Sequence, residues 1–159
     1  MTSHYKLSGG GNDFLALVEP ELEPTPEEIA AWCARGLSAG ADGLFVLERL
    51  EGNRVGMRYF NGDGQRAALC LNGTRCAARL AFELGWASGS AQVETDAGTF
   101  DARSAGPHDV EIELPVPSGE PRHLRLTHGE IVWDCWAIEV GVPHLVVFWD
   151  RPMADAPLA

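Results

Sequence analysis

Thiol chemistry is the first possibility that this sequence raises, because its 159 residues include four cysteines, Cys33, Cys70, Cys76 and Cys135. Cys70 lies just before a predicted helix, beside Asn72 and Gly73. Free backbone N–H groups and the positive end of the helix dipole gather at such a position, and both favour a thiolate over a thiol. A thiolate there can act as a base, and the same N–H groups can bind a substrate carboxylate.

The other three cysteines fit a simpler interpretation as small buried hydrophobes. Cys76 falls on the same predicted helix face as Leu80 and Leu84, whereas Cys70 lies outside that face. Cys70 and Cys76 would be ~9 Å apart along one helix, which is too far for a disulfide. The sequence has neither C-x-x-C nor H-E-x-x-H, and its five histidines are scattered, so we predict no metal site.

The charge of the chain excludes several classes of partner. Twelve Lys and Arg against twenty-three Asp and Glu give a formal net charge of -11, so we expect no binding to nucleic acid or to an anionic membrane surface. No apolar run approaches the ~18 residues of a membrane span, and residues 1–7 lack the apolar region of a signal peptide. We therefore expect a cytoplasmic protein with reduced thiols and no membrane association.

Capping signals and apolar spacing predict two helices. The segment 25–28, Thr-Pro-Glu-Glu, forms a capping box that opens a helix running to about residue 35. A second helix is expected over residues 72–84, with Asn72 able to act as its N-cap and Gly85 as its end. Apolar, β-rich segments between turn residues predict strands at residues 5–7, 14–18, 44–47, 55–60, 92–95, 99–103, 110–114, 124–126, 131–140 and 145–149.

A domain boundary is predicted where the composition changes. Pro and Gly are dense over residues 115–121, which makes that stretch the most linker-like part of the chain. We expect an N-terminal domain over residues 1–117 that carries Cys70, followed by a linker and an incomplete second domain over residues 118–159.

Five segments, in order and at similar spacing, resemble motifs of diaminopimelate epimerases. They are Gly-Asn-Asp-Phe at 11–14, Gly-Ala-Asp-Gly at 40–43, Met-Arg-Tyr-Phe-Asn-Gly-Asp-Gly at 57–64, Cys-Leu-Asn-Gly-Thr-Arg-Cys at 70–76 and Gly-Val-Pro-His at 141–144. The resemblance covers most of the chain. It implies an α+β fold in which a curled, mostly antiparallel β-sheet surrounds a central helix, followed by the start of a second similar domain.

The resemblance also implies a reaction that needs neither pyridoxal phosphate nor a metal. In this family two cysteines, one from each domain, flank the α-carbon of an amino-acid substrate, and one takes the α-proton while the other donates one. Cys70 would be the first-domain thiol, and Gly73 would present its N–H to the α-carboxylate. The side chains that would hydrogen-bond the substrate are Asn12, Asn61 and Asn72. The implied enzyme is an isomerase that converts LL- to meso-diaminopimelate, a precursor of lysine and peptidoglycan.

Each asparagine also has a purely structural interpretation, and three departures from the family pattern leave alternatives open. Leu71 replaces the usual glycine after the catalytic cysteine, where a side chain could crowd the carboxylate pocket or forbid a glycine-only backbone angle. Val142 replaces a substrate-binding asparagine, and the second cysteine motif is absent, so the chain would hold half a site and be inactive alone. The alternatives are a racemase or epimerase for another amino acid and a non-catalytic descendant that binds an amino acid.

One further alternative completes the site by self-association. Two copies could face each other across a two-fold axis and set Cys70 opposite its counterpart. We disfavour this homodimer because the strands after residue 119 would keep unpaired edges that invite aggregation. The missing C-terminal half is therefore the expected source of the second thiol.

Overall fold

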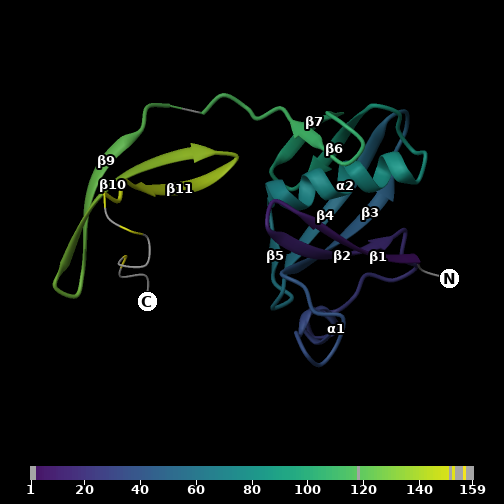
Figure 1. Ribbon diagram of the computed structural model, residues 1–159, viewed down its shortest axis with the longest axis horizontal. Coiled ribbons are helices and arrows are strands. Elements are labelled where there is room, and N and C mark those ends of the chain that lie inside the picture. The colour runs from purple at the N-terminus through teal and green to yellow at the C-terminus, as the bar shows by residue number, and fades with distance from the viewer. Residues whose placement is uncertain (1–2, 118, 151, 153–155, 157–159) are drawn as a thin grey trace. The chain divides into compact units, whose positions relative to one another are not determined.

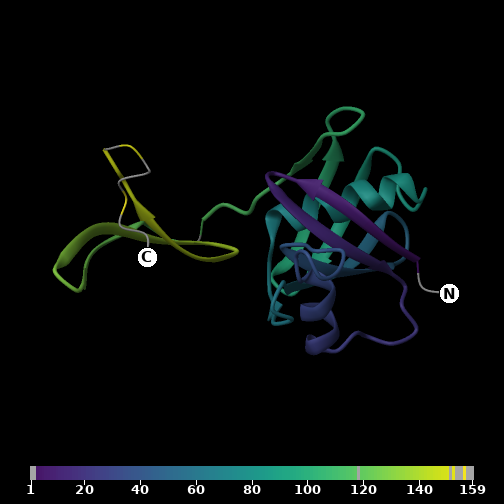
Figure 2. The ribbon, with the colours of Figure 1, turned by 60° about the horizontal axis from the view of Figure 1, so that its bottom comes forward.

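The computed structural model describes residues 3–117, 119–150, 152 and 156. The chain divides into two compact units, Met1–Leu114 and Pro115–Ala159 (Figures 1 and 2). Each unit is built around a sheet of its own. Residue 118 and most of the C-terminal tail, which the predicted second domain includes, lie outside the described residues.

The first unit contains a mixed sheet with strands in the order β1-β2-β3-β4-β6-β7-β8, and the short β5 pairs with β4. These strands are β1 Ser3–Gly9, β2 Asn12–Val18, β3 Gly43–Arg49, β4 Arg54–Asn61, β5 Arg66–Ala67, β6 Ser90–Thr95, β7 Gly98–Ser104 and β8 Val110–Ile112. The β2–β3 and β4–β6 pairs are parallel, and the other pairs are antiparallel. The mostly antiparallel sheet is therefore confirmed, with β5 as a strand that was not predicted.

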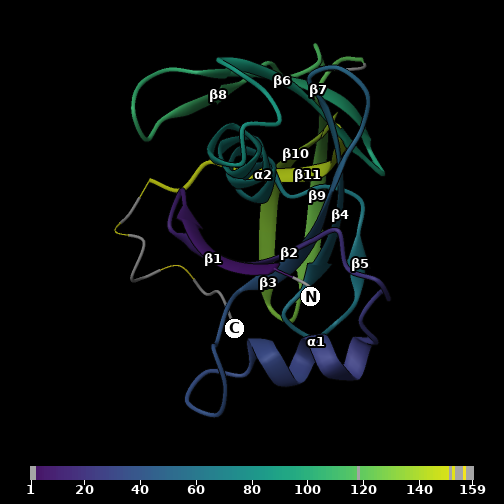
Figure 3. The same cartoon turned by 90° about the vertical axis from the view of Figure 1, so that its right-hand side faces the viewer.

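Helix α2, Leu71–Glu83, lies inside the curl of this sheet (Figure 3). It contacts β1 and β8, the strands at the two edges, as well as strands between them. The buried residues of α2 are mostly small: Gly73, Thr74, Cys76, Ala77, Ala78, Leu80 and Ala81. Small side chains let strands approach the helix from several sides, so the predicted arrangement of a curled sheet around a central helix is confirmed.

Strand β3 is buried on both faces, which explains why its sequence is a continuous apolar run rather than an alternating one. Phe45 and Leu47 belong to the core around α2. Leu44 and Val46 belong to a second cluster on the other face, where Ile29 of the first helix packs. The sheet is therefore the middle layer between two helices.

Helix α1, Pro26–Cys33, begins with the predicted capping box, in which Thr25 and Glu28 exchange side-chain-to-backbone hydrogen bonds. It ends two residues earlier than predicted. The backbone N–H groups of Gly40 and Ala41 donate to the carbonyl oxygens of the last two helical residues, both at 3.0 Å, so the following loop satisfies the end of the helix. No helix among the described residues is long and apolar enough to cross a membrane.

The second unit contains an antiparallel sheet in the order β11-β10-β9, with β9 Arg122–His128, β10 Ile131–Val140 and β11 Val142–Val147. Strand β11 begins three residues before its predicted start and includes Pro143, which pairs with Glu139. A proline is tolerated there because β11 is an edge strand, where a missing N–H need not be paired. Cys135 is buried, but large apolar side chains of this unit remain exposed, and Val116 and Phe148 reach 89% and 81% exposure. The others are Leu126, Ile131, Val132, Trp136, Leu145, Val146 and Val147.

The cysteines divide as predicted, because Cys33, Cys76 and Cys135 are buried and Cys70 is half-buried. Burial raises the pKa of the Cys76 thiol from 9.0 to about 11. A Cβ on Gly9 would come within 2.7 Å of Cys76 Sγ, so the β1–β2 hairpin packs directly on this thiol. Cys76 is therefore a neutral core residue at physiological pH.

Alkaline pH should destabilise the first unit through Cys76. The unfolded thiol titrates near 9.0 and the folded one near 11, so the unfolded state loses its proton first and stability falls as the pH rises between these values. This contribution is about 2–3 kcal/mol. In urea unfolding at neutral pH and near pH 11, Cys76→Ala should start less stable than the parent chain and lose less on alkalisation. An equal alkaline loss in both proteins would contradict this role.

Candidate active site

The start of α2 differs from the prediction in its capping residue. The N-cap is Cys70, and its side chain makes no capping hydrogen bond. Asn72 is the second residue of the helix, and its side chain bonds the β1–β2 turn instead. The proposed capping role of Asn72 is therefore wrong, because the helix begins one residue earlier than the sequence indicated.

Three backbone N–H groups at the start of α2 have no partner among the described residues. The next N–H, of Thr74, donates to the carbonyl oxygen of Cys70 at 2.8 Å. The N–H groups of Leu71, Asn72 and Gly73 have no acceptor among the described residues. Because these groups carry the partial positive charge of a helix N-terminus, they can hold a carboxylate beside the Cys70 thiol.

Tyr59 on β4 is a neighbour of the Cys70 thiol that the sequence analysis missed. Burial raises the pKa of Tyr59, and the nearby Cys70 side chain raises it further. The hydroxyl therefore stays protonated at neutral pH and can donate to a thiolate. Gly43 makes room for it, since a Cβ there would lie 2.6 Å from Tyr59 Oη. The sequence signal that could have identified Tyr59 is its position two residues before Asn61 in the 57–64 motif.

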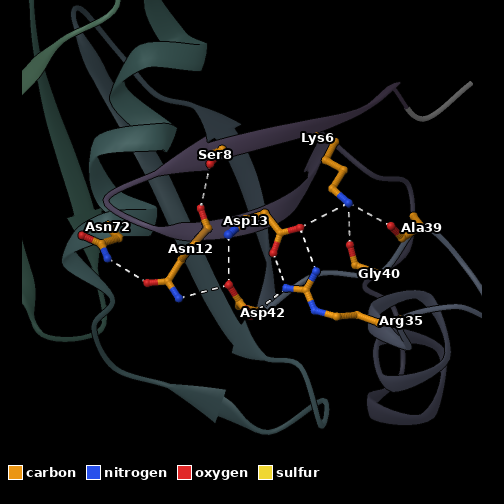
Figure 4. Close-up of polar contacts among 9 residues, drawn as sticks. All are labelled: Lys6, Ser8, Asn12, Asp13, Arg35, Ala39, Gly40, Asp42 and Asn72. Atoms are coloured by element: carbon orange, nitrogen blue, oxygen red, sulfur yellow. Dashed lines mark hydrogen bonds and ion pairs between the residues drawn. The ribbon is translucent and has the colours of Figure 1, made fainter. Parts of the chain in front are cut away.

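Asn72, Asn12 and Asp42 form a chain of side-chain hydrogen bonds that joins α2 to β2 and to the 40–43 loop (Figure 4). Asn72 Nδ2 donates to Asn12 Oδ1 at 2.8 Å, and Asn12 Nδ2 donates to Asp42 Oδ2 at 3.1 Å. Asn72 Nδ2 also reaches the carbonyl oxygen of Gly10 at 3.3 Å, and Arg75 donates to Asn72 Oδ1. The structure therefore brings Asn12 and Asn72 together, bonded to each other.

The β1–β2 turn can approach α2 this closely because of Gly10. Its φ of +62° is a conformation that side-chain-bearing residues rarely adopt. A Cβ at this position would also lie 2.5 Å from Asn72 Oδ1. Both facts explain why the turn is built from glycine.

Asp42 also belongs to an ion cluster (Figure 4). Arg35 lies 2.8 Å from Asp42 and forms a two-pronged hydrogen bond with Asp13, and Lys6 lies 3.2 Å from Asp13. The hydrogen bond from Arg35 holds the pKa of Asp13 well below its usual range. None of these four residues was predicted for the site, although Asp13 and Asp42 lie within the family-like motifs.

Asn61 lies at the end of β4, opposite Gly43 in the sheet register. Its backbone N–H donates to the Gln65 carbonyl oxygen at 2.8 Å, and its exposed side chain bonds none of the described residues. A Cβ on the neighbouring Gly62 would lie 3.1 Å from the Asp42 carbonyl oxygen. Asn61 is therefore near the loop that holds Asn12, but no hydrogen bond joins it to Asn12 or Asn72.

The two substituted motif positions have different settings. Leu71 begins α2 with ordinary helical geometry, since Glu19 is the one non-glycine residue with positive φ in the described part of the chain. The concern about a glycine-only angle at Leu71 is therefore wrong. Its side chain lines a cavity of about 450 Å³ with Arg75 and residues of β8 and the segment after it. Val142 lies on β11 in the second unit.

No cluster of three or more His, Cys, Asp or Glu side chains that could hold a metal occurs among the described residues. The candidate site of the first unit thus consists of the half-exposed Cys70 thiol, three unpaired N–H groups at the start of α2 and the Tyr59 hydroxyl. Hydrogen-bonded asparagines and ion pairs support these groups.

A family model described as diaminopimelate epimerase matches residues 4–116. The chain belongs to the diaminopimelate epimerase family. The diaminopimelate epimerase of Synechococcus sp. (strain JA-3-3Ab) is 36% identical in an alignment 170 positions long, gaps included, that covers 94% of this chain and 59% of that protein. The diaminopimelate epimerase of Archaeoglobus fulgidus is 32% identical in an alignment 173 positions long, gaps included, that covers 97% of this chain and 61% of that protein. The chain therefore spans about three fifths of the length of these curated relatives.

Solved structures with the same fold include other epimerases and racemases. A hydroxyproline epimerase from Agrobacterium vitis with bound trans-4-hydroxy-L-proline has a TM-score of 0.66 at 14% identity, covering 92% of this chain and 51% of that one. A probable proline racemase from Agrobacterium radiobacter K84 with bound carbonate has a TM-score of 0.65 at 12% identity, with coverage of 92% and 52%. These likenesses show that this member of the diaminopimelate epimerase family shares its fold with both proteins.

Removing Arg35 should weaken the fold most at neutral pH. Because the folded pKa values of Asp13 and Asp42 are lowered, their contribution to stability is present above the ordinary value of 3.8 and is lost as the pH falls below it. Urea unfolding should therefore show Arg35→Gln less stable than the parent at pH 7, with the difference shrinking on acidification. Arg49→Gln is the control, since Arg49 is exposed and forms no ion pair with a described residue. A difference that grows below pH 3.8 would contradict the cluster's role.

Proposed function

We propose that this chain supplies one half of the active site of a cofactor-independent amino-acid epimerase, with Cys70 as one of its two acid/base thiols. The half-exposed Cys70 at the uncapped start of α2 is the observation that carries the proposal. Membership of the diaminopimelate epimerase family supports the reaction class.

The surroundings of Cys70 suit removal of an α-proton. A substrate carboxylate bound to the N–H groups of Asn72 and Gly73 would place its α-carbon beside the thiol, which is the positioning that proton transfer requires. The same N–H groups would stabilise the negative charge that spreads onto the carboxylate when the proton leaves. Asn12 and Asn61 would contribute polar contacts at the rim of this site.

Inversion requires a second thiol on the opposite face of the α-carbon, because the new proton must arrive from the side opposite to removal. The remaining cysteines of the chain are buried, so the second thiol would come from another polypeptide segment. The curated relatives extend beyond the part that this chain matches, which supports such a source. The chain alone would then bind substrate weakly and turn it over poorly.

Diaminopimelate, converted from the LL to the meso form, is the substrate that the relatives' names support. The solved neighbours are named for hydroxyproline and proline, so the alternative within the same chemistry is another amino acid. Val142 favours the remaining alternative, a non-catalytic amino-acid-binding protein, because its side chain cannot hydrogen-bond a substrate.

Joined to the C-terminal remainder of the Synechococcus relative, the chain should exchange the α-proton of diaminopimelate for deuterium in heavy water. Cys70→Ala should lower exchange and turnover by about 10²–10⁴-fold, the usual contribution of a positioned acid or base. NMR measures the exchange, and circular dichroism checks that the variant is folded. Cys76→Ala is the matched control, which should lose stability while the folded protein retains turnover.

The outcomes separate the alternatives. Full turnover in Cys70→Ala would refute the assignment of the base. Exchange with other amino acids but not with diaminopimelate would favour a different racemase. Calorimetric binding of diaminopimelate without any exchange, in the joined protein with all cysteines intact, would favour the non-catalytic alternative.

A further inference from the structure

The hydrogen-bond chain from Asp42 to Asn72 runs in one direction. A carboxylate can only accept, so Asp42 Oδ2 requires the amide nitrogen of Asn12 to face it, at 3.1 Å. Asn12 Oδ1 must then face the other way, where it accepts from Asn72 Nδ2 at 2.8 Å. The Asp42 carboxylate thus sets the orientation of the Asn12 amide, and the Asn12 amide sets that of Asn72.

Asn72, the last side chain in this series of hydrogen bonds, has no donor left for a substrate. Asn72 Nδ2 donates to Asn12 Oδ1 and to the Gly10 carbonyl oxygen, while Asn72 Oδ1 accepts from Arg75. A flipped Asn72 would turn its amide nitrogen toward the Arg75 guanidinium, donor against donor. What Asn72 leaves free is its backbone N–H, next to that of Gly73.

Asp42 is held in place from its other side. Its Oδ1 accepts from Arg35 at 2.8 Å, and its Oδ2 accepts from the backbone N–H of Asp13 at 3.0 Å. Hydrogen bonds from Asn12, then Asp13 and Arg35, lower the pKa of Asp42, so it stays an acceptor across the physiological range. The anchor of these hydrogen bonds is therefore an ionised carboxylate, paired with Arg35 in the turn that follows α1.

We propose that Asp42 is a positioning residue: acting through Asn12 and Asn72, it holds the first turn of α2 against the β1–β2 turn so that the N–H groups of Asn72 and Gly73 face the substrate carboxylate. This inference rests on the proposed carboxylate site beside Cys70. It changes the role of two predicted substrate ligands, because the side chains of Asn12 and Asn72 transmit an orientation and the backbone of α2 binds.

Alkylation of Cys70 in the chain itself can test this without turnover. Iodoacetate carries a carboxylate and iodoacetamide does not, while both attack the same thiolate. The ratio of their rates at Cys70 therefore reports how well the neighbouring N–H groups hold a carboxylate, and the thiolate fraction cancels. Cys33, Cys76 and Cys135 are buried, so peptide mass spectrometry can follow one reactive thiol.

The parent chain should prefer iodoacetate more strongly than the urea-unfolded chain does, despite its net charge of -11. Asp42→Asn should lower the ratio about fivefold, the usual scale of an anion at a helix N-terminus. Simple electrostatics predicts the opposite, since the variant loses a negative charge and should attract the anion more. A fall in the ratio therefore marks lost geometry.

Asp13→Asn is the matched control, because it removes the same charge from the same Arg35 cluster but lies outside the chain to Asn72. Its ratio should stay equal to the parent's or rise. Asn12→Ala breaks the chain without changing charge, so it should lower the ratio as Asp42→Asn does, and it covers the case in which Asp42→Asn does not fold. Circular dichroism checks each variant.

The failures are distinguishable. If the folded parent chain shows no more preference for iodoacetate than the unfolded chain, the proposed carboxylate site itself fails. If the parent shows the preference and folded Asn12→Ala or Asp42→Asn keeps it, the carboxylate site stands and the positioning role of Asp42 is overturned. An equal fall in Asp13→Asn would also overturn it, because the effect would then belong to the ion cluster as a whole.

Discussion

Burial of α2 inside the curled sheet is the constraint on which the rest of the first unit depends. A helix that touches strands on so many sides cannot carry large or charged residues there, and its buried positions are mostly glycine, alanine and cysteine. The polar ends of such a helix must emerge where the sheet leaves them open. At its N-terminal end the chain places a thiol and unpaired N–H groups instead of a capping side chain, so these groups share the opening that packing requires.

The uncapped start of α2 is held by hydrogen bonds to residues outside the helix. An ordinary N-cap satisfies the orphan N–H groups and fixes the helix start together. Here the two tasks are separated, because Asn72 ties the first turn sideways to Gly10 and Asn12 and leaves the N–H groups unoccupied. Asp42 and Arg35 extend these contacts to the turn that follows α1. Segments distant in sequence thus converge behind the opening and keep their side chains out of it.

The sequence predicted local features well and three-dimensional partnerships poorly. The capping box at Thr25, the burial of Cys76 and the continuous apolar β3 each depend on short-range patterns that the chain displays directly. The helix start was placed one residue late, because Asn72 is a common capping residue and only the fold shows that its side chain is used elsewhere. Tyr59 and Asp42 were missed as site residues for a related reason: their neighbours come from other strands and loops.

The burial of the cysteines also determines which thiol of this chain is oxidised first. Peroxides attack exposed thiolates first, and Cys70 is the half-buried one among three buried thiols. Cys76 lies ~9 Å farther along the helix axis than Cys70, which is too far for a disulfide, and its sulfur packs against Gly9 of β1. A sulfenic acid formed at Cys70 therefore has no resolving thiol beside it in the first unit. A small thiol or a thiol of another protein molecule must reduce it, since otherwise a second peroxide oxidises it to the irreversible sulfinic acid.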